Sequence, residues 1–275
     1  MKGVGKYFLF IGCIVLNACV EQVDIEDYVK SKPSGMLVVE GLITNEFKPH
    51  YVKLTRTGKA LPDEPYESVS GAEITIDDGT FSYPLTETSP GTYETDSIRG
   101  EVNKAYTLTI NINGEVFTAT DTMIPVLKFG QAEGIVMGSN TPPKGYVGTP
   151  LIVFGSSAPA MVSIEIGNPK ATDKYTRLDY YAFPGVDPDD ILPKYVEASL
   201  AYDEGTQLIQ KKYSLSEPHY LFLRALLLET EYKGGIFGSV RANVPTNISG
   251  GASGFFGACE MIDRSGTIGK DGKLH

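Results

Sequence analysis

Short runs in which apolar and polar residues alternate dominate the chain between residues 36 and 125. Alternation with a period of two places every second side chain on one face, as in a half-buried β-strand. The clearest run covers residues 106–112, where Tyr106, Leu108, Ile110 and Ile112 share a face. It ends at Asn113-Gly114, and alternation resumes at Glu115. Asn-Gly between two such runs predicts a tight β-hairpin, because both residues tolerate positive φ angles.

A second hairpin is expected upstream of this one. Residues 72–76 alternate, Asp77-Asp78-Gly79 follows, and residues 80–85 continue the pattern. Asp-Gly predicts a type I′ turn with positive φ at both central residues. Pro84 is expected at a strand edge or end, because it has no N–H to donate. Gly41, inside the β-rich run 36–43, indicates a bulge or a close backbone approach.

These patterns predict a mainly β fold. Strands at short intervals with turn residues between them favour an antiparallel β-sandwich of the immunoglobulin or transthyretin kind for residues 36–125. Residues 126–275 are expected to form a second β-rich domain with long Gly- and Pro-rich loops. One amphipathic helix is expected there, at about residues 216–231, with Ser216 as its cap and an apolar stripe formed by Tyr220, Leu223, Leu226 and Leu227.

The first nineteen residues have the features of an export signal. Lys2 and Lys6 precede an apolar run at residues 7–16, which is too short to span a bilayer as a helix. The ending Leu16-Asn17-Ala18-Cys19 resembles the lipobox of bacterial lipoproteins, in which the cysteine is acylated and becomes the first residue. We therefore expect a signal peptide at residues 1–18, lipidation of Cys19 and an acidic tether at residues 19–35. The alternative is an ordinary secreted protein that is cleaved near Ala18.

Charge narrows the range of partners. The formal net charge is −10, and removal of the signal takes away two lysines and no acid. Nucleic acid is excluded as an expected partner, because phosphate binding requires clustered Lys and Arg. Electrostatic attachment to an anionic membrane is excluded for the same reason. Acyl chains on Cys19 would then hold the protein to outer-membrane lipid. Cys259 is left without a disulfide partner, and we expect it to pack as a small apolar residue.

The motifs of common enzymes are absent from the sequence. Its three histidines, His50, His219 and His275, do not form a metalloprotease spacing, and no nucleophile elbow or phosphate-binding loop occurs. We therefore expect no catalytic residue, no metal and no cofactor. The acidic segment 185–190 could supply oxygen ligands to calcium but is expected to be a solvated loop. Ser97 and Thr122, each preceded by an aspartate, resemble acceptors for O-glycosylation in exported Bacteroidota proteins.

Several segments together resemble a known family. They are residues 37–45, 51–57, 69–79, 91–93, 106–110, 117–125, 243–248 and 254–258. They are similar to a Bacteroidota lipoprotein family catalogued as domain of unknown function forty-two forty-nine. The resemblance implies an outer-membrane lipoprotein, often encoded beside a TonB-dependent receptor, and it assigns no catalytic residue. The acids that follow Cys19 resemble the surface-export signal of such lipoproteins, so the cell surface is the expected location.

The sequence leaves three functions open. The first is a non-enzymatic accessory or substrate-capture subunit of a TonB-dependent transporter. The second is a surface adhesin or structural module, since isolated sandwiches often only adhere. The third is a glycan or peptide hydrolase that uses a carboxylate pair, which cannot be selected from 34 acidic residues without geometry.

Overall fold

The computed structural model describes residues 35–57, 66–129, 145–148, 152–154, 156–167, 177–185, 199–202, 205–230, 244–269 and 275. The protein is mainly β, as predicted, with two large sheets and one helix among these residues. The signal peptide, Cys19, the acidic tether and residues 186–190 of the acidic segment lie outside the described residues. Within the described part, no helix has the length and apolar character needed to cross a membrane.

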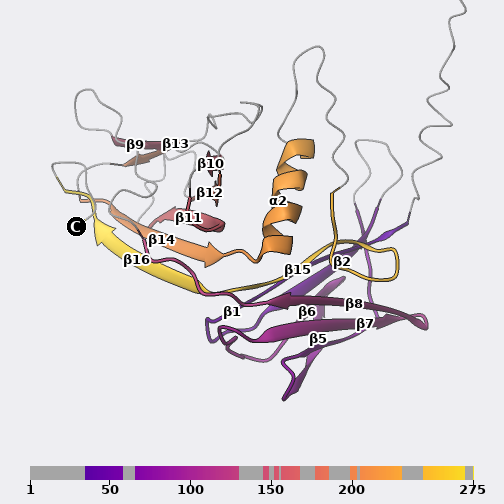
Figure 1. The fold of residues 1–275 in the computed structure, drawn as a ribbon. Coiled ribbons are helices and arrows are strands. Elements are labelled where there is room, and N and C mark those ends of the chain that lie inside the picture. The colour runs from indigo at the N-terminus through magenta and orange to yellow at the C-terminus, as the bar shows by residue number, and fades with distance from the viewer. Residues whose placement is uncertain are drawn as a thin grey trace, which may run out of the picture.

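The larger sheet has nine strands and forms the lower body in Figure 1. Its strands pair in the order β15-β1-β2-β6-β5-β4-β7-β8, and β3 pairs with β2 beside this path. All of these pairs are antiparallel except β1 with β15, which is parallel. The strands are β1 (Leu37–Thr44), β2 (Tyr51–Arg56), β3 (Glu67–Ser68), β4 (Glu73–Asp77), β5 (Ser82–Ser89), β6 (Thr92–Glu94), β7 (Ala105–Ile112), β8 (Glu115–Thr122) and β15 (Ser253–Cys259).

The two ends of this sheet approach each other. The backbone N–H of Ser249 donates to the carbonyl of Thr118, and Ile124 forms a parallel bridge with Cys259. The sheet therefore curls around one core. Its largest fully buried side chains include Tyr93, Tyr106, Leu54, Leu108, Ile110 and Phe256. The predicted face Tyr106, Leu108, Ile110 and Ile112 is confirmed as buried.

The two predicted hairpins form, and one turn differs from expectation. Asn113 and Gly114 both have positive φ, 52° and 83°, as predicted. At the other hairpin only Gly79 has a positive φ, so the type I′ turn predicted there is wrong. Its loop is longer, because Asp77 pairs with Ser82. The Asp78 carboxylate closes this loop by accepting the N–H groups of Thr80 and Phe81, each at 2.8 Å.

The expectation for Pro84 is confirmed, whereas Gly41 forms no bulge and is approached most closely by side chains rather than by backbone. Pro84 lies in β5 and pairs with Thr75 on β4. On its other side β5 is unpaired at this point, because β6 pairs with β5 only from Thr86 onward. Its missing N–H therefore costs no ladder hydrogen bond. At Gly41 a Cβ atom would lie 3.1 Å from side-chain carbons of both Phe256 and Val52. The glycine allows this close packing of neighbouring strands.

The smaller sheet has five strands in the order β10-β12-β11-β14-β16. They are β10 (Ile152–Phe154), β12 (Arg177–Phe183), β11 (Ala160–Ile166), β14 (Gln207–Ser214) and β16 (Met261–Thr267). A separate pair is formed by β9 (Gly145–Gly148) and β13 (Ser199–Tyr202). One face of the five-stranded sheet carries a core of Val162, Ile164, Ile166, Tyr180, Leu208 and Ile268. The opposite face is turned toward the helix and the larger sheet (Figure 1).

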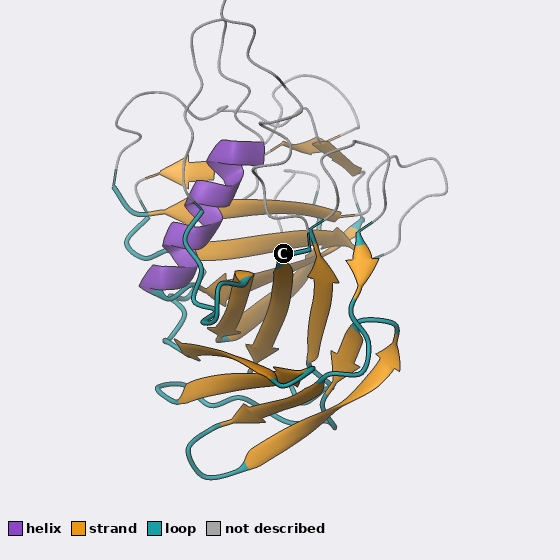
Figure 2. Cartoon of the chain, turned by 90° about the vertical axis from the view of Figure 1, so that its right-hand side faces the viewer, coloured by secondary structure: helices purple, strands orange, loops and turns teal. Residues whose placement is uncertain are grey.

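The predicted helix is confirmed as α2 (Glu217–Thr230). Ser216 caps it, because its hydroxyl accepts the N–H of His219 at 3.3 Å. Tyr220, Leu223 and Leu227 pack against the smaller sheet, and Phe222 stacks on Phe255 of β15. Helix α2 therefore contacts both sheets: it stands beside the smaller sheet, and its first turns lie over β15 (Figures 1 and 2).

A single residue, Glu260, connects β15 of the larger sheet to β16 of the smaller one. We call this point the crossing, and define it by Ile124, Val126, Ser214 and Glu260. The Ser214 hydroxyl donates to the carbonyl of Ile124 at 2.7 Å and accepts the N–H of Glu260 at 2.9 Å. The Glu260 carboxylate accepts the N–H of Val126 at 2.6 Å. Strand β15, which comes from the part of the chain after residue 126, is an edge strand of the larger sheet.

Candidate functional site

The residues singled out from the sequence lie apart from one another. Cys19 is outside the described residues. Ser97 lies exposed in the turn after β6, and Thr122 is the exposed last residue of β8. Both hydroxyls are accessible, and O-glycosylation at them stays a prediction. Neither residue belongs to the clusters that follow.

A buried cysteine–histidine contact was not predicted. The Cys259 sulfur lies 3.7 Å from Nδ1 of His219, where the first turn of α2 meets the end of β15. Burial and the nearby charge of Asp121 raise the pKa of the Cys259 thiol well above its usual range. Burial also lowers the pKa of His219 to about 4. At neutral pH both groups are therefore uncharged.

This electrostatic state excludes nucleophilic catalysis by Cys259. A catalytic cysteine needs a thiolate stabilised by a positive neighbour. Here the thiol is fully buried, and the imidazole stacks on Phe255 at a ring distance of 4.7 Å. The expectation that Cys259 packs as a small apolar residue is confirmed.

Asp121 is a buried carboxylate with a structural role. Its carboxylate accepts hydrogen bonds from the backbone N–H of Ala258, at 2.8 Å, and from the backbone N–H of Thr122, at 2.9 Å. The Ser216 hydroxyl is its third partner. Burial raises the pKa of Asp121, and these three hydrogen bonds oppose that rise. The residue connects β8, β15 and the start of α2.

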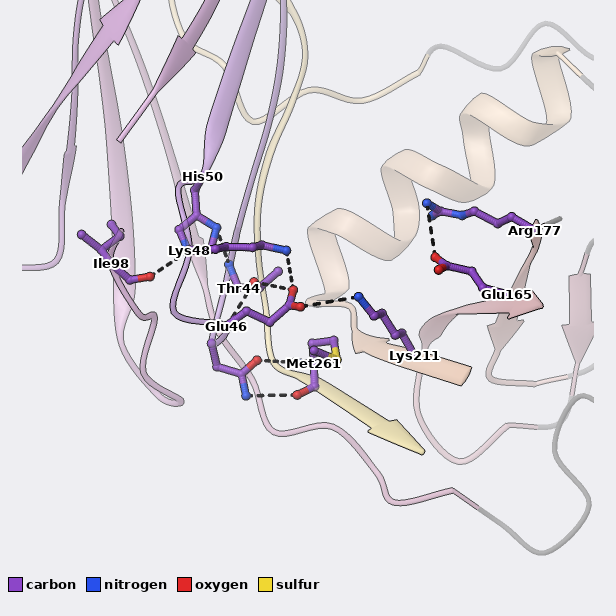
Figure 3. A network of polar contacts seen from close by, with 10 residues as sticks. Thr44, Glu46, Lys48, His50, Ile98, Glu165, Arg177, Lys211 and Met261 are labelled. Atoms are coloured by element: carbon purple, nitrogen blue, oxygen red, sulfur yellow. Dashed lines mark hydrogen bonds and ion pairs between the residues drawn. The ribbon is translucent and has the colours of Figure 1, made fainter. Parts of the chain in front are cut away.

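His50 is likewise satisfied within the protein (Figure 3). Its Nδ1 accepts the N–H of Thr44 at 3.4 Å, so Nε2 carries the proton and donates to the Ile98 carbonyl at 3.2 Å. Burial lowers the pKa of His50 below its ordinary value. Both ring nitrogens are occupied, so the side chain positions the β1–β2 loop and is unavailable as a base.

The β1–β2 loop also contacts the smaller sheet directly (Figure 3). The Asn45 amide donates to the Met261 carbonyl at 3.0 Å and accepts the Met261 N–H at 2.7 Å. We call this pair of hydrogen bonds the Asn45 clamp. It fixes the loop against the first residue of β16.

Beside the clamp, charged residues from both sheets come together. We call this group the junction cluster, and it comprises Glu46, Lys48, Glu165, Arg177, Asp179, Lys211 and Tyr213. Glu46 pairs with Lys48 in its own loop and with Lys211 of β14, at 3.6 Å. On the neighbouring strands, Arg177 Nε contacts both oxygens of Asp179, at 2.9 and 3.1 Å. Its Nη1 lies 3.9 Å from Glu165 (Figure 3).

The strand registers explain why these side chains share one face. Glu165 of β11 lies opposite Arg177 of β12, and Ser163 lies opposite both Asp179 and Lys211. Alternation turns Val162 and Ile164 into the core on the other face. The sequence shows this alternation on each strand. It does not show which strands are neighbours, and that is why the cluster was missed.

Tyr213 lies among these charges. Burial raises the pKa of its hydroxyl to about 12, with further contributions from Glu46, Glu165 and Asp179 and opposition from Arg177. The hydroxyl therefore stays protonated and can donate a hydrogen bond. The charged members of the junction cluster are partly exposed, whereas Tyr213 itself is buried. The cluster therefore presents donors and acceptors at its edge, and none of the contacts described for it pairs a nucleophile with a base.

No group of three or more metal-ligating side chains occurs in the part of the chain that the structure describes. The carboxylates of the junction cluster instead have Lys and Arg partners. In this face, positive side chains occupy the positions that a cation would need.

Comparison with solved structures yields only distant similarity. A pullulanase from Anoxybacillus sp. LM18-11 in complex with maltotriose matches at 13% identity with a TM-score of 0.21, over 66% of this chain and 24% of that chain. A second structure of pullulanase from the same source matches at 13% identity, with a TM-score of 0.20 and 25% of that chain covered. This chain thus spans about a quarter of those proteins, and so low a score carries no argument about fold or activity.

Comparison with protein families is informative. No curated protein matches the chain significantly. A family profile described as a domain of unknown function, DUF4249, matches residues 21–263. This range covers nearly all of the chain beyond the expected signal peptide and spans both sheets. The protein therefore belongs to the DUF4249 family.

Proposed function

We propose that this protein is a non-enzymatic outer-membrane lipoprotein, held by lipid on Cys19 at the cell surface. There it acts as an accessory or substrate-capture subunit of a TonB-dependent transporter. The proposed location is supported by the export signal and by the lipobox ending at Cys19. The acidic charge supports attachment through acyl chains rather than through basic residues.

The observation that carries the capture role is the junction cluster. It displays six charged side chains from two sheets on an accessible face, and their side-chain exposures range from 22% for Glu46 to 53% for Arg177. The Asn45 clamp, α2 and the crossing hold the two sheets together around this face. A face assembled in this way is pre-organised, which lowers the entropic cost of binding.

The absence of an activated nucleophile at the Cys259–His219 contact favours binding over catalysis. Both groups are neutral at physiological pH, for the reasons given above. The hydrolase alternative is tested by screening the purified protein against polysaccharides and peptides. Turnover that is lost on substitution of Glu165 or Asp179 would contradict the proposal.

Membrane anchorage is tested at Cys19. The wild-type chain should incorporate labelled palmitate and fractionate with the outer membrane. The C19A variant should lose both properties and keep its fold, because residue 19 precedes every strand of the larger sheet. A C259A variant is the matched control, since it removes the buried thiol and leaves the lipid attachment site intact. Lipid anchorage would be contradicted if C19A still fractionated with the outer membrane and the wild type incorporated no labelled palmitate.

The transporter partner is tested separately. A tagged chain extracted from its native membrane in mild detergent should co-purify with a β-barrel receptor of the TonB-dependent class, identified by mass spectrometry. Recovery of the intact lipoprotein without any such receptor would contradict the accessory role. If a deletion strain then kept nutrient uptake and lost surface attachment, the adhesin alternative would replace it.

A further inference from the structure

Strand β16 forms one edge of the smaller sheet, and among the described strands it pairs with β14 alone. The backbone groups of successive residues point to opposite sides of a strand. The Glu260 carbonyl accepts the N–H of Ser214, and the Ile268 N–H donates to the Thr206 carbonyl, so the even-numbered residues face β14. The odd-numbered residues of β16 therefore turn their N–H and C=O groups outward.

Both ends of this outward edge already have partners. At Met261, the Asn45 clamp satisfies the backbone N–H and C=O with one side-chain amide. At Thr267, the backbone of His275 donates one hydrogen bond and accepts another, each at 3.0 Å. Each partner lies where a residue of a neighbouring antiparallel strand would lie. The outer edge of β16 thus has the geometry that receives a strand.

Between these two partners the edge is open. Asp263 and Ser265 are both exposed. Within the described residues, no hydrogen bond reaches their outward N–H and C=O groups. A short extended segment therefore fits between the two occupied positions.

The edges of the larger sheet are covered instead. Beside β15, the Asn247 amide bonds both the N–H and the C=O of Phe256, and Asp121 accepts the N–H of Ala258. The unpaired part of β5 contains Pro84, which has no N–H to offer. Natural proteins cover edges in such ways because an open edge pairs with other chains. The open residues of β16 therefore mark a place where a further strand can be added.

A second copy of this chain does not fit this edge. A closed dimer would pair β16 with its copy antiparallel, around a two-fold axis. With the axis at Arg264, this residue lies directly opposite its own copy, and like charges so placed are destabilising. With the axis at Asp263 or Ser265, the pairing includes Met261 or Thr267, which already have partners. The register therefore favours a different protein.

The side chains along the open edge indicate what a partner strand carries. Asp263 is exposed and has no ion pair among the described residues. Arg264 lies on the opposite face, where its guanidinium stacks on Phe129 at 4.4 Å from the ring centre. Oppositely charged side chains directly across an antiparallel pair stabilise the pairing. A complementary strand therefore has a basic residue opposite Asp263 and, one position earlier in its sequence, an acidic residue opposite Arg264.

We propose that the outer edge of β16, between the Asn45 clamp and His275, receives an extended segment of a partner protein by strand addition. The segment pairs antiparallel with Asp263 and Ser265 and carries an acidic residue followed by a basic one. This inference rests on the proposed accessory function and names the surface that holds the partner. Backbone pairing supplies the affinity, and the two charged positions select the segment.

The test is photo-crosslinking in the native outer membrane with the full lipidated chain. A short diazirine side chain is placed at residue 263 or at residue 265, and the crosslinked peptides are sequenced by mass spectrometry. We expect both positions to reach one segment of one partner polypeptide. The residue crosslinked from position 265 should lie about two positions before the residue crosslinked from position 263, because the strands are antiparallel.

Two variants at Ser265 separate backbone pairing from side-chain contact. S265P removes the outward N–H at no cost to the β14 ladder, and should lower crosslinking from position 263 at least about tenfold. The matched control S265A keeps this N–H and should stay within about twofold of the wild type. D263N should lower crosslinking from position 265 about two- to fivefold, through loss of an exposed ion pair. If S265P does not fold, D263P replaces it, with crosslinking from position 265.

The proposal is overturned if neither position crosslinks a partner, if the crosslinks fall on a second copy or on this chain itself, or if folded S265P crosslinks as well as S265A. These outcomes differ from those of the co-purification experiment. A receptor that co-purifies without crosslinking at positions 263 and 265 removes this inference and leaves the accessory role intact. A crosslink in the expected register to a protein of another class supports strand addition and contradicts the accessory role.

Discussion

Individual buried side chains in this protein are kept uncharged by their surroundings. His219 is packed against Phe255 and Cys259, and burial lowers its pKa to about 4. His50 is held in one tautomer by two backbone groups. Cys259 stays a thiol because it is buried and lies near Asp121. At the residue scale, the polar atoms of the helix–sheet contact serve packing and orientation.

Acidification should destabilise the fold through His219. Its pKa is 6.5 in the reference state and about 4 when folded. Between pH 4 and pH 6.5 the unfolded chain binds more protons at His219 than the folded chain does. The free energy of unfolding is therefore unaffected by this residue above pH 6.5 and decreases as the pH falls toward 4. In urea titrations across this range, H219Q should flatten the decrease by on the order of 2 kcal/mol.

The wild-type chain is the reference for this experiment. Asp121, whose pKa is raised by burial, contributes with the opposite sign, since the folded state then binds the extra proton. The quantity to measure is therefore the difference between H219Q and the wild type in how the free energy of unfolding changes with pH. Equal slopes would show that His219 is not protonated on unfolding in this range.

The Cys259 thiol should be unreactive in the folded protein. Its burial and raised pKa suppress the thiolate that reacts with disulfide reagents. We expect negligible labelling by an aromatic disulfide reagent at mildly alkaline pH and rapid labelling after denaturation in urea. The proposed lipoprotein form is the right sample, because acylation of Cys19 and removal of the signal peptide would leave Cys259 as its remaining thiol. Labelling of the native protein at the rate of a free thiol would contradict this assignment.

At the scale of elements, β15 is the strand on which the architecture depends. It pairs in parallel with β1, and one residue later the chain enters the smaller sheet as β16. Its early residue Gly254 has φ of +96°, and a Cβ there would lie 1.9 Å from the Val39 carbonyl oxygen. The parallel pairing therefore requires glycine at this position.

Replacing Gly254 should disrupt this pairing. G254A adds a methyl group that would collide with the Val39 backbone, in addition to the strain of a positive φ. We expect a loss of at least about 3 kcal/mol in the free energy of unfolding, measured by urea denaturation. The matched control is G251A, which has φ of +79° and open space around its Cβ, and should cost about 1 kcal/mol. Equal effects of the two variants would contradict the steric argument.

At the scale of the whole molecule, three contacts combine two sheets into one structure. They are the crossing, the Asn45 clamp and α2, which packs on the smaller sheet and stacks on β15. The junction cluster lies beside the clamp (Figure 3), so its geometry depends on these contacts. Loss of one contact should therefore affect both the stability of the fold and the arrangement of the junction cluster.

Removing the Asn45 clamp tests this dependence. N45A deletes two hydrogen bonds to Met261 and should lower the free energy of unfolding by about 1–3 kcal/mol. Hydrogen exchange followed by mass spectrometry should show protection falling in β16 and in the β1–β2 loop together. The control N111A changes an exposed residue of β7 and should have little effect. A decrease confined to the loop would show that the sheets are not coupled there.

Local features of this protein could be predicted from its sequence. Alternation identified the buried face of β7, and Asn113-Gly114 identified its hairpin, because positive φ angles are a property of the residues themselves. The start and extent of α2 followed from a capping serine and an apolar stripe. The Asp78 turn was mispredicted, because the aspartate side chain closes a longer loop than the dipeptide pattern implies.

Long-range relations were decided only by the tertiary structure. Alternation tells which side chains share a face, but it does not tell which strand lies alongside. The parallel pairing of β1 with β15 joins segments at opposite ends of the chain, and Glu46 meets Lys211 across two sheets. The sequence by itself thus determined the elements and the expected lipid anchor, whereas packing between distant strands created the junction cluster.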